Sequence, residues 1–382
     1  MAEEFVVTPW EVKGEIDYNK LIDRFGTQRV DEGLLERIRS LAGEVHPLLT
    51  RGVFYSHRDM DWILDEYEKG YKFYLYTGRG PSSQVHVGHL IPWVFTRWLQ
   101  DTLDVRLYFQ ITDDEKFLFR DFESLEESTR VGYENVLDII ALGFDPRRTR
   151  VIFDSKLIRR LYPLALRVAR RITFSTVKAV FGFTPSSNVG EIFYTSIQAV
   201  PCFLESARQG RNVPCLIPCG IDQDPHFRIA RDVAPHLGYY KPALIHNKLM
   251  PSLEGMQAKM SASSPTSAIF LTDEPETARE HVMNAVTGGG ATVEEHRKYG
   301  GKPEICPVYH HYAYFFEWDD DRLKEVYDTC RTGARLCGDC KAELGDKVAS
   351  FLANHQEKRE KARDRIHEFV MTEEELDGPG PG

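Results

Sequence analysis

The chain has 382 residues, of which 42% are hydrophobic and 28% charged, so it is long enough for two or three domains with a substantial core. Its formal net charge of −10 argues against wholesale, non-specific binding of nucleic acid and gives no reason to expect a DNA partner. No apolar run reaches membrane-spanning length, and residues 1–4 lack the basic and apolar parts of a secretory signal, so we expect a cytoplasmic protein without a membrane partner.

The first part of the chain, residues 1–71, mixes short apolar pieces with a helical stretch over residues 31–42. Nothing in it suggests a catalytic group, and His57 on its own is more often a structural residue. We interpret this part as an N-terminal extension that packs on a catalytic core.

A strand, a glycine turn and a helix come next. Residues 73–77 read Phe-Tyr-Leu-Tyr-Thr, an aromatic and β-branched run of strand length. Gly78 and Gly80 stop this strand, and residues 90–100 have a mostly apolar face at helical spacing. From here on strands and helices alternate, which predicts a parallel sheet with helices on its faces.

Two histidines three residues apart, His86 and His89, lie at the start of this helix, so their rings point to one side. Imidazole donors, added to the free backbone N–H groups of a helix N-terminus, make a site for a polyphosphate. Gly88 leaves room for a flat base or ribose to lie against the backbone. A lone histidine or glycine pair would be weak evidence, but the order strand, Gly-Arg-Gly-Pro-Ser-Ser, His-Val-Gly-His is far more specific.

This combination resembles the first signature of class I aminoacyl-tRNA synthetases, and residues 76–83 are similar to those of the tryptophanyl-tRNA synthetases of eukaryotes and archaea. The interval from Pro81 to His86 is one residue shorter than in many eukaryotic members, which leaves open whether Gln84 or Val85 faces the adenosine. The resemblance implies an α/β fold: a Rossmann-type parallel-sheet catalytic domain with an α-helical C-terminal anticodon-binding domain.

The resemblance also sets the expected boundaries. It implies an extension over residues 1–71, in which residues 56–59 support the ATP site, and a catalytic domain over residues 72–272. An insertion over about residues 150–205 would build the interface of a homodimer. A helical anticodon-binding domain would follow over residues 273–367, and then a C-terminal tail over residues 368–382.

Polar residues follow a buried strand predicted over residues 105–112. The strand ends in Gln110 and is followed by Asp-Asp-Glu-Lys at residues 113–116. The carboxyl ends of parallel strands are where open α/β sheets bind ligands. By themselves these residues might be only a charged turn, but beside the histidine pair we interpret them as a pocket wall.

A basic region spans residues 147–178, where Asp154 is the only acid. Its basic residues are Arg147, Arg148, Arg150, Lys156, Arg159, Arg160, Arg167, Arg170, Arg171 and Lys178. Such a concentration in an acidic chain could contact RNA phosphates. A solvated helix face is an equally good interpretation of any single residue.

Two later segments complete the pattern. A strand predicted over residues 213–221 ends in Gly220, which permits close approach of a sugar, and Asp222, whose carboxylate can accept from ribose hydroxyls. This resembles the Gly-x-Asp-Gln element of the tryptophan and tyrosine branch. Lys259 to Ser261, on a polar loop, resembles the second class I signature. The two signatures arise from opposite halves of the fold and meet only across a nucleotide.

The site residues carried over from the family fall into three groups. The catalytic set is Arg79, His86, His89 and Lys259. The ATP-binding set is Gly78, Gly80, Ser82, Gly88, Gly220, Asp222, Met260 and Ser261. The tryptophan-binding set is Tyr76, Gln110, Glu115, Gln198 and Gln223. The implied partners are ATP with Mg²⁺, L-tryptophan and tRNA(Trp), and the implied reaction is a two-step tryptophan–tRNA ligation.

Three other functions were weighed. A tyrosyl-tRNA synthetase shares the fold and both signatures, but its pocket needs polar partners for a phenol hydroxyl, whereas Gln110, residues 113–116 and Gln198 resemble the tryptophan branch. A small nucleotidyltransferase also uses His-x-Gly-His but lacks the long helical C-terminal region. A non-catalytic RNA-binding or signalling descendant is disfavoured by the intact His86, Gly88, His89 and Lys259.

Seven cysteines in a cytosolic chain do not suggest disulfides. Three of them lie in apolar or strand contexts as small core residues: Cys202, Cys215 and Cys219. The other four are Cys306, Cys330, Cys337 and Cys340. Their spacing is similar to a four-cysteine arrangement that holds a [4Fe–4S] cluster in a subset of bacterial tryptophanyl enzymes. A cluster, a Zn²⁺ ion and free thiols all remain open.

Overall fold

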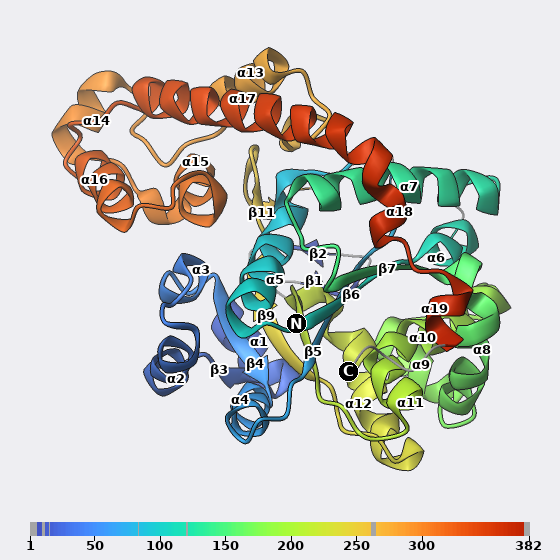
Figure 1. The fold of residues 1–382 in the computed structure, drawn as a ribbon. Coiled ribbons are helices and arrows are strands. Elements are labelled where there is room, and N and C mark those ends of the chain that lie inside the picture. The colour runs from blue at the N-terminus through green and yellow to red at the C-terminus, as the bar shows by residue number, and fades with distance from the viewer. Residues whose placement is uncertain are drawn as a thin grey trace.

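The computed structural model describes residues 6–9, 12–14, 16–82, 84–119, 121–260 and 265–377. A seven-stranded sheet in the order β3-β4-β9-β8-β5-β6-β7 forms its centre (Figure 1). These strands are β3 (Gln28–Arg29), β4 (Phe54–Arg58), β5 (Tyr74–Arg79), β6 (Arg106–Ile111), β7 (Thr149–Phe153), β8 (Cys215–Gly220) and β9 (Ala243–Asn247). The five from β9 to β7 are parallel, β4 runs antiparallel to them, and β3 is antiparallel to β4. The predicted α/β class is confirmed.

Helices cover both faces of the sheet because its strands are apolar on both sides. Leu75 of β5 faces a core shared with α5 (Leu90–Leu103) and α7 (Leu125–Ala141). Tyr74 and Tyr76 face the opposite core. That second core contains α8 (Asp154–Ala169), α10 (Val189–Gln198), α11 (Leu204–Gln209) and α12 (Asp224–Leu237).

The N-terminal extension joins the sheet as well as packing on it. Its β4 pairs with β9, and the guanidinium of Arg58 donates to both carboxylate oxygens of Asp224 at 2.7 and 2.9 Å. Around this strand lie β1 (Val6–Val7), β2 (Val12–Lys13), α1 (Tyr18–Phe25), α2 (Glu32–Ala42), α3 (Pro47–Thr50) and α4 (Met60–Glu68). The extension therefore contributes directly to the sheet that carries the site.

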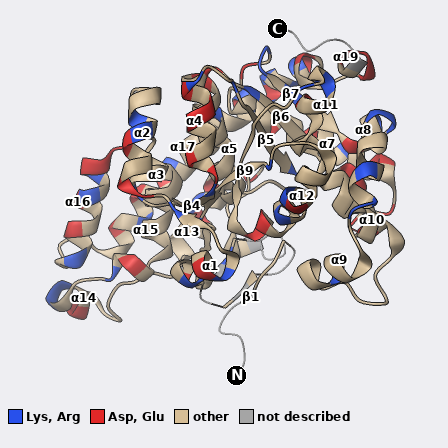
Figure 2. Cartoon of the chain, turned by 90° about the horizontal axis from the view of Figure 1, so that it is seen from below, with Lys and Arg blue, Asp and Glu red and all other residues tan. Residues whose placement is uncertain are grey.

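The C-terminal region is helical, as predicted. Its elements are α13 (Pro275–Asn284), α14 (Val293–Tyr299), α15 (Pro307–His311), the π-helix η6 (Tyr312–Phe316), α16 (Asp320–Arg331) and α17 (Cys337–Ala362). The long helix α17 runs from α14 and α16 back to α7 (Figure 1). There His355 Nε2 lies 3.0 Å from Asp138 Oδ1, both side chains being buried. Acidic and basic residues alternate along α16 (Figure 2).

The smaller elements complete the chain. They are α6 (Asp113–Leu118), α9 (Phe174–Phe181), the hairpin of β10 (Pro251–Ser252) and β11 (Gly255–Lys259), α18 (Ile366–Phe369) and α19 (Glu373–Asp377). Short 3-10 turns are η1 (Val87–His89), η2 (Val200–Cys202), η3 (Ile221–Gln223), η4 (Pro265–Ser267), η5 (Pro303–Ile305) and η7 (Arg363–Arg365). Among the described residues, no helix is long and apolar enough to cross a membrane.

The structure shows how the start of the expected insertion and the expected C-terminal tail are placed. Residues 149–153, which the sequence placed at the start of an insertion, form the edge strand β7 of the main sheet. The expected C-terminal tail packs along this strand, since Met371 N donates to Val151 O at 2.8 Å and Leu376 is buried. Backbone pairing at this edge protects a strand that would otherwise be open. Residues 378–382 lie outside the described part of the chain.

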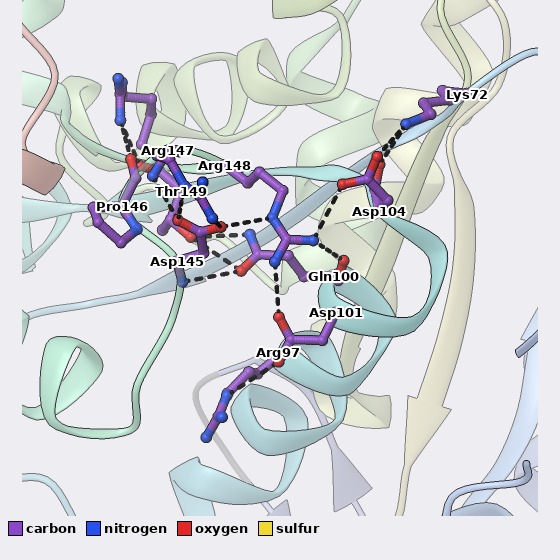
Figure 3. Close-up of polar contacts among 11 residues, drawn as sticks. Lys72, Arg97, Gln100, Asp101, Asp104, Asp145, Pro146, Arg147, Arg148 and Thr149 are labelled. Atoms are coloured by element: carbon purple, nitrogen blue, oxygen red, sulfur yellow. Dashed lines mark hydrogen bonds and ion pairs between the residues drawn. The ribbon is translucent and has the colours of Figure 1, made fainter.

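Four arginines of the basic region pair with carboxylates of the same chain. Arg147 and Arg148 both bond to Asp145, and Arg148 also reaches Asp101 and Asp104 (Figure 3). Farther along, Arg150 pairs with Glu375, and Arg159 pairs with Glu373. These guanidinium groups already have carboxylate partners within the chain, and contact of the region with RNA stays a prediction.

Candidate active site

A cavity of about 290 Å³ lies at the carboxyl ends of the parallel strands. It is walled by Thr77 to Gly80 at the end of β5, by Thr112 after β6, by Gly220 at the end of β8 and by Asn247 at the end of β9. Strand ends at a point where the sheet order reverses are the usual ligand site of an open α/β sheet. The cavity is therefore the candidate active site.

Most of the predicted site residues line this one cavity. They are Gly78, Arg79, Gly80, His86, Gly88, His89, Glu115, Gln198, Gly220, Asp222, Gln223, Lys259 and Met260. Tyr76 and Gln110 are fully buried behind its wall, and Ser82 lies outside it, bonded to Asn135. Ser261 lies outside the described residues. The two signatures therefore face the same space, as predicted.

The histidine pair forms a compact unit with Arg79. The rings of His86 and His89 stack with their centres 3.6 Å apart, and Arg79 Nη1 lies 2.6 Å from His89 Nε2. A guanidinium can only donate, so His89 Nε2 accepts from Arg79, and His89 Nδ1 lies 3.2 Å from both the backbone N and the backbone O of His86. His89 thus orients Arg79, while His86 is the imidazole that remains for a ligand.

Burial decides the charges of this unit. Burial, and then the positive charge of Arg79, hold the pKa values of His86 and His89 well below the usual value. Burial lowers the pKa of Arg79 to about 10, so the guanidinium stays charged at neutral pH. The site therefore presents two neutral imidazoles and a buried cation, which suits an anionic ligand.

Lys259 reaches the cavity from the last residue of β11. Its Nζ lies 2.9 Å from Asp222 Oδ2, so the second signature contacts the Gly-x-Asp-Gln element directly. Asp222 lies on η3, whose following residue Asp224 is held by Arg58 and lies 3.1 Å from His246. The extension thus fixes the segment that carries Asp222, as expected for residues 56–59.

The pKa of Asp224 shows how strong this support is. The Asp224 side chain is completely buried, and burial alone would raise its pKa. The hydrogen bonds from His246 and Arg58 outweigh burial and lower the pKa to about 2. Asp224 is therefore a buried carboxylate that stays charged because of its partners.

Hydrogen bonds connect the far end of the cavity to a buried carboxyl pair. Gln198 Nε2 donates to the Tyr76 hydroxyl oxygen at 2.9 Å, and the Tyr76 hydroxyl donates to Gln110 Oε1. Gln110 Nε2 then donates to both oxygens of Asp154 at 2.8 Å. Burial raises the pKa of Asp154 well above the usual value and, with Asp113, raises that of the neighbouring Asp114 to about 7.

Sequence reasoning missed several residues of the cavity wall. Tyr194, Phe227 and Met250 line it, and Thr112 Oγ1 donates to Glu115 at 2.6 Å. Tyr194 lies four residues before Gln198 on α10, so the helical spacing from a known site residue could have found it. Its hydroxyl donates to Gln198 Oε1.

The four C-terminal cysteines line a second, small cavity together with Arg335. Two glycines make room for them: a Cβ on Gly289 would lie 2.3 Å from Cys337 Sγ, and one on Gly301 would lie 2.6 Å from Cys330 Sγ. Among the described residues, no three His, Cys, Asp or Glu side chains come close enough to hold one metal ion. The thiols thus face one space but do not converge on a single point.

The comparisons with known proteins decide the family. The model of "tRNA synthetases class I (W and Y)" matches residues 68–353. The chain belongs to this class I aminoacyl-tRNA synthetase family. Tryptophan–tRNA ligases of Pyrobaculum calidifontis and Pyrobaculum aerophilum are 50% and 51% identical to it over 97% of this chain and 99% of the relative.

A solved structure of a tryptophanyl-tRNA synthetase is also similar to this chain. The tryptophanyl-tRNA synthetase of Plasmodium falciparum superposes with a TM-score of 0.88 and 38% identity, covering 94% of this chain and 99% of the other. The prediction of an archaeal or eukaryotic tryptophan–tRNA ligase is thereby confirmed over the tyrosyl alternative, because these relatives are named for tryptophan.

Proposed function

We propose that this synthetase performs both steps of tryptophan–tRNA ligation in the one cavity. The tryptophan carboxylate attacks the α-phosphorus of ATP, which forms tryptophanyl-adenylate and releases pyrophosphate. A ribose hydroxyl at the end of tRNA(Trp) then takes the tryptophanyl group and releases AMP. The observation that carries this proposal is that His86, His89 and Lys259, from distant parts of the chain, line the same cavity.

The phosphate end of the reaction is assigned to Arg79, His86 and Lys259. Each presents N–H donors or positive charge to the cavity, where such groups stabilise charge that builds on phosphate oxygens. His89 acts through Arg79, whose guanidinium it accepts. The Mg²⁺ ion arrives with ATP. Lys259 leaves Asp222 when ATP enters, because the ribose hydroxyls then donate to that carboxylate.

The tryptophan end is assigned to the wall formed by Gln198 and Tyr194. The Tyr76 oxygen accepts an N–H from Gln198 in this structure, and the indole N–H is a donor of the same kind. We infer that the indole takes the place of the Gln198 amide on Tyr76. Glu115 then has a free carboxylate oxygen for the ammonium group.

Pyrophosphate exchange with a panel of amino acids tests this function. The full chain, ATP, Mg²⁺ and labelled pyrophosphate are mixed with each of the twenty amino acids in turn. Exchange with tryptophan alone is the expected result. Exchange with tyrosine at a comparable rate, or with neither amino acid, would overturn the proposal.

We further propose that the four cysteines hold a [4Fe–4S] cluster. A zinc ion with bonds of about 2.3 Å needs its four thiolates nearly in contact, whereas a cluster needs them spread around a larger body. Thiols that share one cavity without converging on a point fit the cluster better. Such a group supplies structural cross-linking of the domain and can exchange an electron.

Metal analysis of anaerobically prepared protein tests the cluster. We expect about four iron atoms per chain and a broad absorbance that bleaches on reduction. Protein with one zinc ion, or metal-free protein with four readily alkylated thiols, would contradict it.

A cytoplasmic homodimer is also proposed. Exposed apolar side chains gather on α8, α9 and α10, where the family builds its dimer interface: Tyr162, Leu166, Phe174 and Val189. Exposed apolar groups rimmed by polar residues indicate a protein interface. One chain has a mass of 43.9 kDa, and light scattering of the purified chain should give twice that mass.

A further inference from the structure

We propose that Asp154 is a positioning residue for tryptophan recognition: it fixes the direction of the hydrogen-bond chain through Gln110 and Tyr76, so that the pocket offers the indole an acceptor. This inference rests on the proposed function. Asp154 is the first residue of α8, is fully buried and does not line the cavity. Its effect on the substrate must therefore pass through other side chains.

The first step is the orientation of the Gln110 amide. Gln110 Nε2 lies 2.8 Å from both carboxyl oxygens of Asp154. If the amide were turned over, its oxygen would face those two oxygens instead. An amide oxygen cannot donate, so that orientation would leave acceptors facing acceptors in a buried place. The Asp154 carboxyl thus turns the Gln110 oxygen toward Tyr76.

The second step concerns the proton of Asp154. A protonated Asp154 could donate to a turned Gln110 oxygen, but the Asp114 carboxyl is its neighbour, and the pKa of each carboxyl responds to the other. Among the described residues, no nitrogen or hydroxyl donor reaches the buried Asp114 Oδ2. Two carboxyls can bond only by sharing a proton, so the Asp154 hydrogen points to Asp114. Toward Gln110, Asp154 then acts only as an acceptor, whether or not it carries a proton.

The third step passes this direction to the pocket. With the Gln110 oxygen facing it at 2.5 Å, the Tyr76 hydroxyl donates to Gln110, while a longer alternative acceptor, Gln198 O, lies at 3.2 Å. The Tyr76 oxygen can then accept a hydrogen bond from the pocket side, where its present donor is Gln198 Nε2. With Gln110 reversed, Tyr76 would accept from Gln110 and its own hydrogen would turn to Gln198 O or to the pocket, so the indole N–H would no longer meet a fixed acceptor. A donor facing a donor costs the bound state a hydrogen bond.

Variants of Asp154 separate these two states. Asp154→Leu keeps the branching and the number of heavy atoms but is larger and removes the acceptor, so nothing holds the Gln110 amide. Asp154→Asn is the matched control, because its Nδ2 donates to Asp114 and its Oδ1 still accepts from Gln110. Asp154→Ser is a smaller polar variant whose hydroxyl can either donate or accept, and so cannot fix the direction. Thermal unfolding of each variant shows whether it folds.

The readout is discrimination between tryptophan and its isostere in which sulfur replaces the indole N–H, benzothienylalanine. We expect the unmodified enzyme to prefer tryptophan in kcat/KM of pyrophosphate exchange by about tenfold or more, since a site built for a donor rejects an analogue that lacks it. Asp154→Asn should retain this preference, and Asp154→Leu and Asp154→Ser should lose most of it. If the role of Asp154 were purely structural, its variants would lower kcat/KM for both substrates equally.

The outcomes are distinguishable from failure of the proposed function. If the unmodified enzyme shows no tryptophan-dependent exchange, the function itself fails. If it exchanges tryptophan but Asp154→Ser keeps the original preference, or the unmodified enzyme accepts both substrates equally, this inference alone is overturned. Should Asp154→Leu fail to fold, Asp154→Ser and Asp154→Asn still decide the matter.

Discussion

The two cavities of this chain differ in how their walls are built. The active-site cavity is lined by side chains from strands, helices and the hairpin over most of the catalytic region, and its charged groups pair across it, as Lys259 and Asp222 do. The cysteine cavity is lined from one domain, mainly by thiols and apolar side chains, with glycines backing two of its thiols. The first can exchange partners when a substrate arrives, whereas the second suits a group that stays.

The largest effect is expected from removing the ion pair of Arg58 and Asp224, which supports the active-site cavity. Arg58→Met removes the cation that bonds both oxygens of Asp224 and leaves a buried carboxylate with the His246 imidazole as its remaining close partner. Removing one partner of a buried pair costs about 3–5 kcal/mol. Urea unfolding at pH 7 measures this, and the cysteine site should keep its iron.

The ion pair of Arg58 and Asp224 also determines how the free energy of unfolding changes at acid pH. The pKa of Asp224 is lowered in the folded protein to about 2 from its ordinary value of 3.8, so its stabilising effect is full above pH 3.8 and is lost as pH falls through 2. The difference in unfolding free energy between the parent and Arg58→Met should therefore shrink below pH 4. A difference that stays constant from pH 7 to pH 2 would show that the pair is not its source.

Lys259→Ala tests the chemistry of the active-site cavity and leaves the ion pair of Arg58 and Asp224 in place. Because the ammonium stabilises charge that builds on the phosphates, turnover should fall by about 100-fold to 1000-fold, while the KM for ATP changes far less. Steady-state pyrophosphate exchange separates the two parameters. A variant with normal turnover and only a raised KM would remove Lys259 from its assigned role.

Gly289→Ala tests the cysteine cavity alone. The new methyl group would lie 2.3 Å from Cys337 Sγ and 3.2 Å from His296 Nδ1, so the thiol must rotate out of the cavity. Overpacking of this kind costs about 1–3 kcal/mol, and iron content should fall well below that of the parent. Adenylate formation should persist, because the active-site cavity shares no lining residue with this one. Full iron content in this variant would be evidence against the cluster.

The elements that could be predicted from sequence are those whose pattern is local. The strand before Gly78 and the helix after His89 follow from runs of apolar residues, and the structure has them as β5 and α5. Strands β7 and β9 were missed. In β7 the neighbouring arginines at 147, 148 and 150 hid a five-residue strand. Asp145 pairs with two of them locally, but Asp101 and Glu375, which also pair with them, lie far away in the sequence.

The site was predicted where a motif names the residue, and missed where tertiary contact gives it a role. That His86, His89 and Lys259 face one cavity followed from their motifs. The roles of His89 as an acceptor for Arg79 and of Asp154 behind Gln110 did not, because each depends on a hydrogen-bond direction that only the packed structure fixes. In the sequence Asp154 was only the single acid of a basic run.

The smallest expected effect is the most direct test of why glycine is present in the cysteine cavity. Gly338 lies between Cys337 and Cys340 in the first turn of α17, but a Cβ there would meet nothing within 4 Å. Gly338→Ala should therefore leave the iron content unchanged and raise the unfolding free energy by up to about 1 kcal/mol, since alanine loses less backbone entropy in a helix. Loss of iron in Gly338→Ala would show that any methyl group near the thiols in the sequence disrupts the site. The free space around each sulfur atom would then not explain why glycine is present.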